Sequence, residues 1–119
     1  MMFSNVQQFQ TLFATTPQLT KKGNAFVYQF KRGEELYAFT LSSSEKMINI
    51  RVEKDTRTIG LFEFQHIHHV DIVENGANEK RLQLVVQHEQ KIQVVDIQLK
   101  PYFSIALKET DSMPVGVSS

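Results

Sequence analysis

The sequence contains no cysteine among its 119 residues. The chain therefore forms no disulfide bond, offers no thiolate to a metal ion and has no cysteine nucleophile. An excess of charge of one sign is also missing, because 13 basic residues balance 13 acidic ones. A protein that binds nucleic acid or an anionic membrane carries a basic surface, so we expect no nucleic acid as a partner.

Long apolar runs are missing too, and no stretch reaches the length of a transmembrane helix. Residues 1–16 lack the basic start of a signal peptide, and glutamines interrupt their apolar residues. We therefore expect no membrane span and a cytoplasmic location. What is present suffices for a core: 41% of the residues are apolar and 22% are charged, which is typical of one globular domain.

An amphipathic helix is predicted near the N-terminus, from Ser4 to Ala14. Ser4 is a good N-cap, and Gln7 stands three residues later, as in a capping box. An apolar stripe follows at helical spacing: Val6, Phe9, Leu12 and Phe13. Pro17 ends the helix, because the residue before a proline avoids helical backbone angles. We assign residues 1–24 to this helix and a linker, and expect the stripe to pack on a sheet.

Seven β-strands are predicted between Ala25 and Leu99, where apolar and polar residues alternate. Two hairpins follow from the register that brings apolar residues opposite one another, with turns at residues 32–35 and 43–46. The predicted pairs of the first hairpin are Phe26 with Leu41, Tyr28 with Phe39 and Phe30 with Tyr37. Those of the second are Leu41 with Ile48, Phe39 with Ile50 and Tyr37 with Val52.

The later strands are expected to be less regular. Gly60 stands where the apolar face of the fourth strand switches, which suggests a bulge, and residues 64–68 are typical of a corner between two sheets. A second switch at Val94–Val95 also predicts a bulge. Residues 101–108 are predicted to form a short C-terminal helix, with a final strand as the alternative. The β domain is thus expected to span residues 25–110, before a flexible tail at 111–119.

These elements define an α+β fold, mainly antiparallel β, in which a seven-strand meander forms a small barrel or two packed sheets. The strand order resembles the pleckstrin-homology-like architecture over residues 25–107, and residues 62–72 are similar to that fold's crossing between sheets. This resemblance implies a phosphoinositide site at the first hairpin turn, where Lys31 and Arg32 lie. A helix packed on a curved sheet, as in cystatin-like folds, is the alternative.

Three histidines carry the clearest candidate chemistry. The register of the hairpin that follows the corner places His66 opposite His88 and His68 opposite Val86, so three imidazoles would project at one end of the hairpin. Imidazoles at this spacing can share a divalent transition metal ion, and Glu89 can supply a further ligand. Two alternatives stay open: solvated polar residues at a sheet corner, and a pH-sensitive surface.

The carboxylates form no catalytic pair, and we predict no catalytic residue. Asp96 lies within a predicted strand, where an inward carboxylate would act as a general base and an outward one would be solvated. The leading hypothesis is a non-enzymatic binding or assembly module that binds a protein partner or self-associates as a homo-oligomer. Many of the eleven glutamines lie on polar strand faces, which suits such contacts.

Two other functional hypotheses stay open. One is a metal-binding protein or metal-dependent enzyme that uses the histidine cluster. The other is a small carrier of apolar ligands, for which the aromatic side chains of the first two strands would line the cavity. We expect no cofactor other than the divalent transition metal of the first of these hypotheses.

Overall fold

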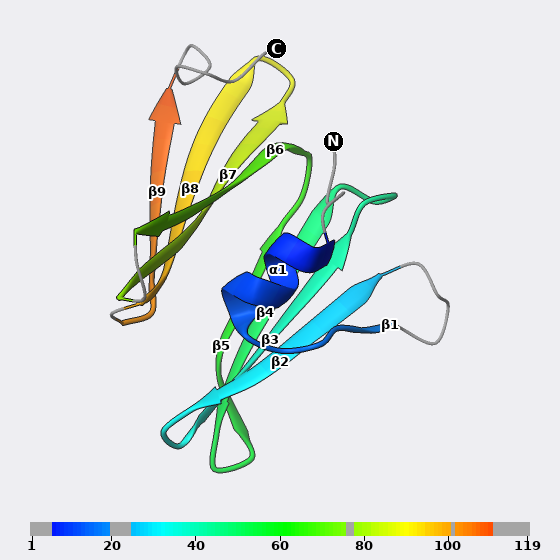
Figure 1. The fold of residues 1–119 in the computed structure, drawn as a ribbon. Helices are drawn as coiled ribbons and strands as arrows, with labels where there is room; N and C mark the ends of the chain where they lie inside the picture. Colours follow the sequence, from blue (N-terminus) through cyan, green and yellow to red (C-terminus); the bar gives the residue numbers. More distant parts are fainter. Residues whose placement is uncertain (1–5, 20–24, 76–77, 101, 111–119) are drawn as a thin grey trace. The chain divides into compact units, whose positions relative to one another are not determined.

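The computed structural model describes residues 6–19, 25–75, 78–100 and 102–110. The chain divides into an N-terminal unit, residues 3–65, and a C-terminal unit that holds residues 66–119. Each unit contains one antiparallel sheet, in which strands consecutive in the chain are neighbours (Figure 1). The predicted cap at Ser4 and the predicted tail at 111–119 lie outside the described residues.

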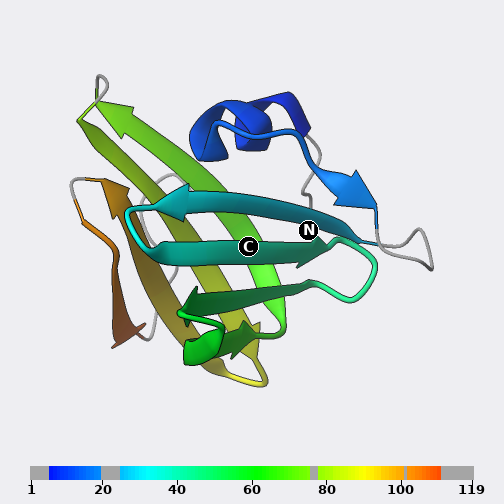
Figure 2. The ribbon, with the colours of Figure 1, turned by 90° about the horizontal axis from the view of Figure 1, so that it is seen from below.

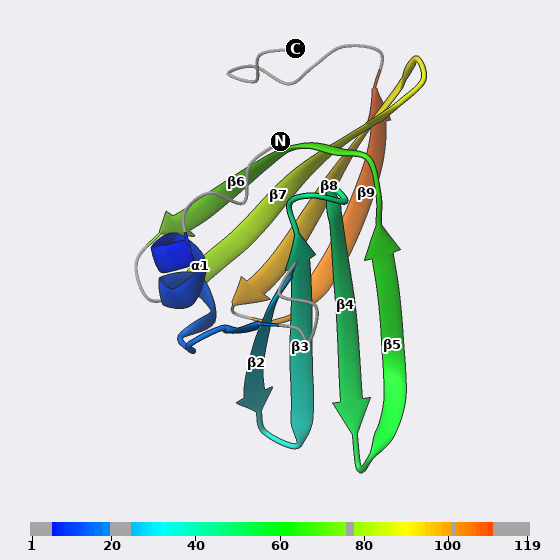
Figure 3. The same cartoon turned by 90° about the vertical axis from the view of Figure 1, so that its right-hand side faces the viewer.

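The N-terminal unit consists of helix α1 (Val6–Phe13) and a five-stranded sheet in the order β1-β2-β3-β4-β5. Its strands are β1 (Gln18–Leu19), β2 (Phe26–Arg32), β3 (Glu35–Ser42), β4 (Met47–Lys54) and β5 (Arg57–Phe64). Figure 2 shows α1 on the β2 side of this sheet, and Figure 3 shows β2 to β5 side by side. This order is the predicted meander of hairpins.

The predicted register of the first two hairpins is confirmed at every pair. Phe39 lies at the centre, between Tyr28 on β2 and Ile50 on β4. The predicted irregularity of the fourth strand is confirmed as well. The register between β4 and β5 shifts next to Gly60 and leaves Ile59 without a pairing partner on β4.

The two turns differ in length. The turn between β3 and β4 spans residues 43–46, as predicted. The predicted four-residue turn between β2 and β3 is wrong, because Arg32 pairs with Glu35 and only residues 33–34 connect the strands. Gly33 has φ +61 there, a conformation that glycine adopts without strain and that a two-residue hairpin turn requires.

Aromatic rings fill the core of the N-terminal unit. Tyr28 and Phe39 are 1% and 0% exposed. The Phe13 ring of α1 lies against both, with its centroid 5.0 Å from that of Tyr28 and 4.6 Å from that of Phe39. Phe9, one helical turn earlier, lies 6.1 Å from Tyr28. The apolar stripe of the helix therefore packs on the aromatic face of the sheet, as predicted.

Helix α1 ends in a Schellman motif. The N–H of Thr15 donates to the C=O of Gln10 at 3.2 Å, and the N–H of Ala14 donates to the C=O of Thr11 at 3.3 Å. Ala14 has φ +54, so an alanine occupies the left-handed position that glycine usually takes. Within the described residues no helix is long and apolar enough to cross a membrane.

The C-terminal unit is a four-stranded sheet in the order β6-β7-β8-β9. Its strands are β6 (Ile67–Asn75), β7 (Glu79–His88), β8 (Lys91–Lys100) and β9 (Ser104–Thr110). The central strands carry fully buried side chains: Leu82, Leu84, Val85, Val95 and Ile97. Leu84 and Val85 are consecutive, so the sheet buries apolar residues on both faces at this point.

The predicted C-terminal helix at residues 101–108 is wrong, and the alternative of a final strand is confirmed. Residues 104–110 form strand β9, which pairs with β8 along its whole length. The helical spacing of Phe103, Ala106 and Leu107 is outweighed by this pairing. It places Ile105 beside Ile97 and gives hydrogen-bond partners to backbone groups of β8 that would otherwise be unpaired.

Two further expectations about the architecture change. The described strands form two open sheets, so the closed barrel is wrong, and they number nine, because β1 and β9 join the seven predicted strands. The resemblance to the pleckstrin-homology-like architecture is not confirmed, since a strand stands where its closing helix was expected. What holds is a mainly antiparallel β fold in two sheets with little helix.

The predicted bulge at Val94–Val95 is also wrong. β7 and β8 pair regularly there, because Val94 faces Val85 and forms an apolar pair on the second face of the sheet. The irregularity occurs instead at Leu99, opposite the step from Lys80 to Arg81. Val94 and Val95 are therefore both apolar because apolar residues pack on both faces of the sheet, and not because the strand contains an extra residue.

Candidate functional site

The chain passes from the N-terminal sheet to the C-terminal sheet within residues 64–68, as predicted. His66 lies in this corner with φ +57, a left-handed backbone conformation. Its C=O accepts a hydrogen bond of 3.0 Å from the N–H of Gln87. This bond fixes the backbone of His66 beside the end of β7, where His88 lies.

The rings of His66 and His88 stack on one another. Their centroids lie 4.1 Å apart and their planes differ by 30°. Both residues are exposed. The carboxylate Oε1 of Glu89 lies 4.0 Å from Nε2 of His88. The structure therefore brings together the two histidines that the predicted register placed opposite each other.

His68 does not join this pair. A shift of register at His68 pairs Ile67 with Val86 and His69 with Val85, so the predicted pairing of His68 with Val86 is wrong. The physical reason is burial: Ile67 is 0% exposed and takes the apolar position in the ladder. Nδ1 of His68 is buried and finds no hydrogen-bond partner among the described residues.

The two stacked imidazoles and the nearby carboxylate form a smaller ligand set than the predicted cluster of three histidines. Within the described part of the chain, no group of three or more His, Asp or Glu side chains is arranged to hold a metal ion. A metal ion bound by two imidazoles completes its coordination with water or other donors. Metal binding by His66, His68 and His88 stays a prediction.

The basic residues Lys31 and Arg32 end β2 in a turn of mixed charge. Lys31 is exposed and Arg32 is half-buried. Arg32 lies beside Glu35 in the strand ladder, and Oε2 of Glu34 lies 4.0 Å from Nζ of Lys54. The carboxylates of Glu34 and Glu35 therefore lie in or next to the turn that holds Lys31 and Arg32. The phosphoinositide site at this turn stays a prediction.

The tyrosines of the N-terminal core are poor candidates for proton transfer. Burial raises the pKa of Tyr37, and the negative charge of Glu35 raises it further, as does the hydrogen bond of 3.3 Å that the hydroxyl donates to Oε1 of Glu35. The positive charge of Arg32 opposes this shift. Burial also raises the pKa of Tyr28. Both tyrosines are therefore neutral at physiological pH and belong to the core.

Asp96 belongs to an ion-pair network. Its Oδ2 lies 3.2 Å from Nη1 of Arg81, and Nε of Arg81 lies 3.2 Å from Oε1 of Glu79. The side chain of Asp96 is 36% exposed, while its Oδ1 is buried and has no hydrogen-bond partner among the described residues. This placement matches a structural charge on a sheet face rather than an inward general base.

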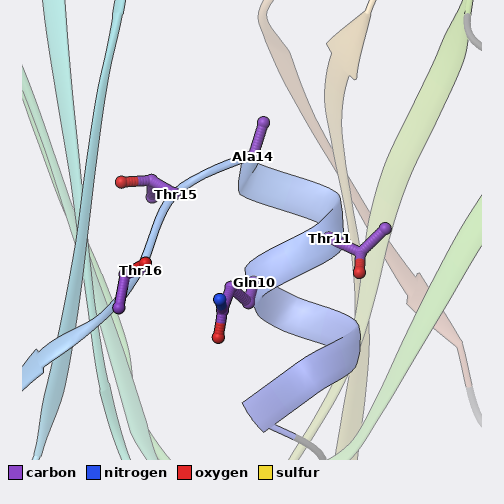
Figure 4. Close-up of a pocket in the computed structure, with 5 residues that line it drawn as sticks. All are labelled: Gln10, Thr11, Ala14, Thr15 and Thr16. Atoms are coloured by element: carbon purple, nitrogen blue, oxygen red, sulfur yellow. The ribbon is translucent and has the colours of Figure 1, made fainter.

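A shallow depression of about 360 Å³ lies beside the end of α1. It is lined by Gln10, Thr11, Ala14, Thr15 and Thr16, which Figure 4 shows along the last turn of the helix and the segment after it. These side chains supply neither an acid, a base nor a strong metal ligand. The depression therefore offers no chemistry beyond hydrogen bonding, and the hypothesis of an apolar-ligand carrier stays a prediction.

Strand β5 exposes large apolar side chains at an open sheet edge. It is the last strand of the N-terminal sheet, and Ile59 and Leu61 are 55% and 59% exposed. Arg57 and Glu63 are exposed on the same strand. Arg57 pairs with Lys54 and Glu63 pairs with Asn49, so the register shift puts these two charges on opposite faces of the sheet. We call Ile59, Leu61 and Glu63 the β5 surface. The sequence shows the switch of apolar face at Gly60, but no signal in it marks Ile59 and Leu61 as a binding surface.

Comparisons with known proteins give a fold and no family. No family model and no curated protein matches the chain. A solved structure with a TM-score of 0.75 and 15% sequence identity is described as a contact-dependent growth inhibition toxin–immunity protein complex from Klebsiella pneumoniae 342. The match covers 89% of this chain and 94% of the other chain. At this level of identity the similarity shows that the two chains share a fold.

Proposed function

We propose that this protein is a non-enzymatic protein-binding module whose partner docks on the β5 surface. The observation that carries the proposal is the exposure of Ile59 and Leu61 on a strand at an open sheet edge. An edge strand offers backbone N–H and C=O groups to a further strand, and exposed apolar side chains add buried area to that contact.

The apolar part of this contact is worth a few kilocalories. Full burial of an Ile or Leu side chain contributes about 1.5–3 kcal/mol. Since Ile59 and Leu61 are each a little over half exposed, burying both contributes about 2–3 kcal/mol. Association itself costs more than this. The partner must therefore also form backbone hydrogen bonds along β5 or contacts with neighbouring residues.

The structural neighbour supports a protein as the partner. A chain with this fold occurs in a complex of a toxin with its immunity protein. Because one fold can serve many functions, this similarity does not identify the partner. The proposal therefore rests on the β5 surface and uses the neighbour only as an indication of the class of partner.

Site-specific photo-crosslinking in cells tests the proposal. A benzophenone amino acid at position 61 is expected to give covalent protein adducts on irradiation. The matched control is position 29, because Gln29 is also exposed and lies on β2 of the same sheet. If position 61 yields no more protein adduct than position 29, the β5 surface binds no protein and the proposal is refuted.

A second candidate function is binding of a divalent transition metal ion by His66 and His88. The distance of 4.1 Å between their ring centroids favours it, since small rotations of the rings turn both toward one ion. Imidazole is a good ligand for Zn²⁺, Ni²⁺ and Cu²⁺. Glu89 lies close enough to His88 to supply an oxygen.

Calorimetric titration with each of these three metal ions tests the second candidate. We expect one ion to bind per chain, and His66→Ala and His88→Ala each to weaken binding. Gln87→Ala is the control for a surface change beside the pair, and His68→Ala separates the pair from a site of three histidines. A wild-type protein that binds no ion, and whose melting temperature does not rise with metal, would exclude this function.

A further inference from the structure

We infer that a divalent transition metal ion bound by His66 and His88 joins two copies of this chain, and that each copy supplies its own pair of imidazoles. This inference rests on the metal-binding function proposed above as the second candidate, and it names the ligands that complete the site. It is carried by the number of ligands that one chain can supply.

One chain supplies only part of a coordination shell. Zn²⁺ takes four ligands in a tetrahedron, and Cu²⁺ and Ni²⁺ favour four in a plane. The rings of His66 and His88 lie with their centroids 4.1 Å apart. No third His, Asp or Glu side chain is arranged with them to hold a metal ion among the residues that the structure describes. An ion held by this pair therefore keeps two positions open for other donors.

Both imidazoles are accessible to a second copy. Both residues are exposed, and the side chain of His88 is 59% exposed. The rings contact each other, and the carboxylate of Glu89 lies 4.0 Å from Nε2 of His88, but neither ring forms a hydrogen bond within the described part of the chain. The side chains can therefore rotate until one nitrogen of each ring lies about 2 Å from an ion, and no described hydrogen bond is broken.

The surroundings of the pair allow two copies to approach each other. The neighbouring exposed side chains are mostly uncharged: Gln65, Gln87 and Gln90. Glu89 and Lys91 are also exposed, and their opposite charges balance. Two identical surfaces of this kind meet without a net repulsion between like charges.

A second copy offers better donors than a carboxylate or water. Zn²⁺, Cu²⁺ and Ni²⁺ bind imidazole well, whereas carboxylate and water suit Mg²⁺ and Ca²⁺. A two-fold axis through the ion places the same two imidazoles on both sides of it. Four imidazoles then complete the shell of one ion that two chains share. Since each copy contributes only a corner of the chain and the end of a hairpin, we expect the dimer to depend on the ion.

Sedimentation velocity of untagged protein at increasing ratios of Zn²⁺ to chain tests the inference. The dimer is expected to be absent without metal and most abundant at one ion per two chains. Excess Zn²⁺ is expected to dissociate it, because each pair of imidazoles then takes an ion of its own and binding saturates at one ion per chain. His66→Ala and His88→Ala are each expected to abolish the dimer, and Gln87→Ala, an exposed neighbour, is the matched control. Circular dichroism melting checks that each variant is folded.

Glu89→Gln separates the bridge from a site within one chain. The bridge does not use Glu89, so this variant is expected to dimerise with Zn²⁺ as the wild type does. A site made of His66, His88, Glu89 and water would instead bind Zn²⁺ more weakly in the variant and would form no dimer at any ratio. With Cu²⁺ as the probe, electron paramagnetic resonance counts the nitrogen ligands. Four are expected at one ion per two chains, and two in an excess of metal.

Three results would overturn the inference: a wild type that stays monomeric at every ratio of Zn²⁺, a Zn²⁺-dependent dimer that both alanine variants still form, or a copper spectrum with two nitrogen ligands at one ion per two chains. Calorimetry tells failure of the inference from failure of the proposed metal site. Binding that both alanine variants weaken, without a dimer, refutes only the bridge, whereas no binding at all refutes the bridge and the metal site together.

Discussion

Replacing Phe13 with alanine tests whether α1 is an integral part of the N-terminal core. The Phe13 side chain is 3% exposed, and its ring lies within 6.2 Å of four other rings, those of Phe9, Tyr28, Phe30 and Phe39. Removing a buried phenylalanine ring costs about 3–5 kcal/mol, which combines the lost transfer free energy with the cavity that remains. Because rings surround this one on the helix and on two strands, the cavity cannot close fully, and we expect about 4 kcal/mol.

Urea unfolding followed by near-ultraviolet circular dichroism measures this loss, since Tyr28 and Tyr37 report directly on the same core. Phe13→Ala is expected to lower the free energy of unfolding of this unit without changing the denaturant slope. Gln10→Ala, an exposed position on the same helix, is the control and is expected to change it by less than about 0.5 kcal/mol. A loss below about 1 kcal/mol for Phe13→Ala would show that the helix is not packed as described.

Three further outcomes follow from the structure. Ala14→Gly is expected to raise the free energy of unfolding by about 1 kcal/mol in the same assay, because glycine adopts the left-handed conformation at the end of α1 without strain. An unchanged free energy of unfolding would contradict the Schellman motif at this position. Burial raises the pKa values of Tyr28 and Tyr37 above the usual 10.0, so tyrosines ionise first in the unfolded chain. The contribution of these two tyrosines to stability is therefore constant below pH 10 and falls above it, and urea unfolding from pH 9 to 11.5 should show a smaller fall for Tyr37→Phe. A double-mutant cycle of Arg81→Met and Asp96→Asn is expected to give a coupling of about 1 kcal/mol or less, since both side chains are about one third exposed and solvent screens the pair; a coupling above about 2 kcal/mol would contradict this.

The register of the N-terminal sheet was predictable because two local rules agree there. Apolar residues alternate strictly on both sides of Phe39, and a shift by one residue would turn Tyr28 and Ile50 away from the core. The turns are short, so little freedom remains in how the strands can meet. The same pairing rule predicts His66 opposite His88, and the rings of these two residues stack in the structure.

The position of His68 and the C-terminal strand could not be predicted in this way, because they depend on contacts between residues that are far apart in the sequence. At the corner, Ile67 and His68 compete for one ladder position, and burial of Ile67 moves His68 out of register with His66. At the C-terminus, residues 104–110 fit a helix and a strand equally well by spacing, and the open edge of β8 decides in favour of the strand. In both places tertiary structure overrides the local pattern. The alternative would leave Ile67 unburied at the corner, or backbone groups of β8 unpaired at the C-terminus.

The hairpin order of both sheets has a consequence for how the chain folds. Every hydrogen-bonded strand pair joins strands that are consecutive in the chain, and the described turns within the two central hairpins of the N-terminal sheet span only residues 33–34 and 43–46. The chain therefore closes short loops one after another, and the sequence separation of its contacts is low for a β protein. Folding is expected to be faster than in sandwiches with crossing connections, with each hairpin serving as the template for the strand that follows it.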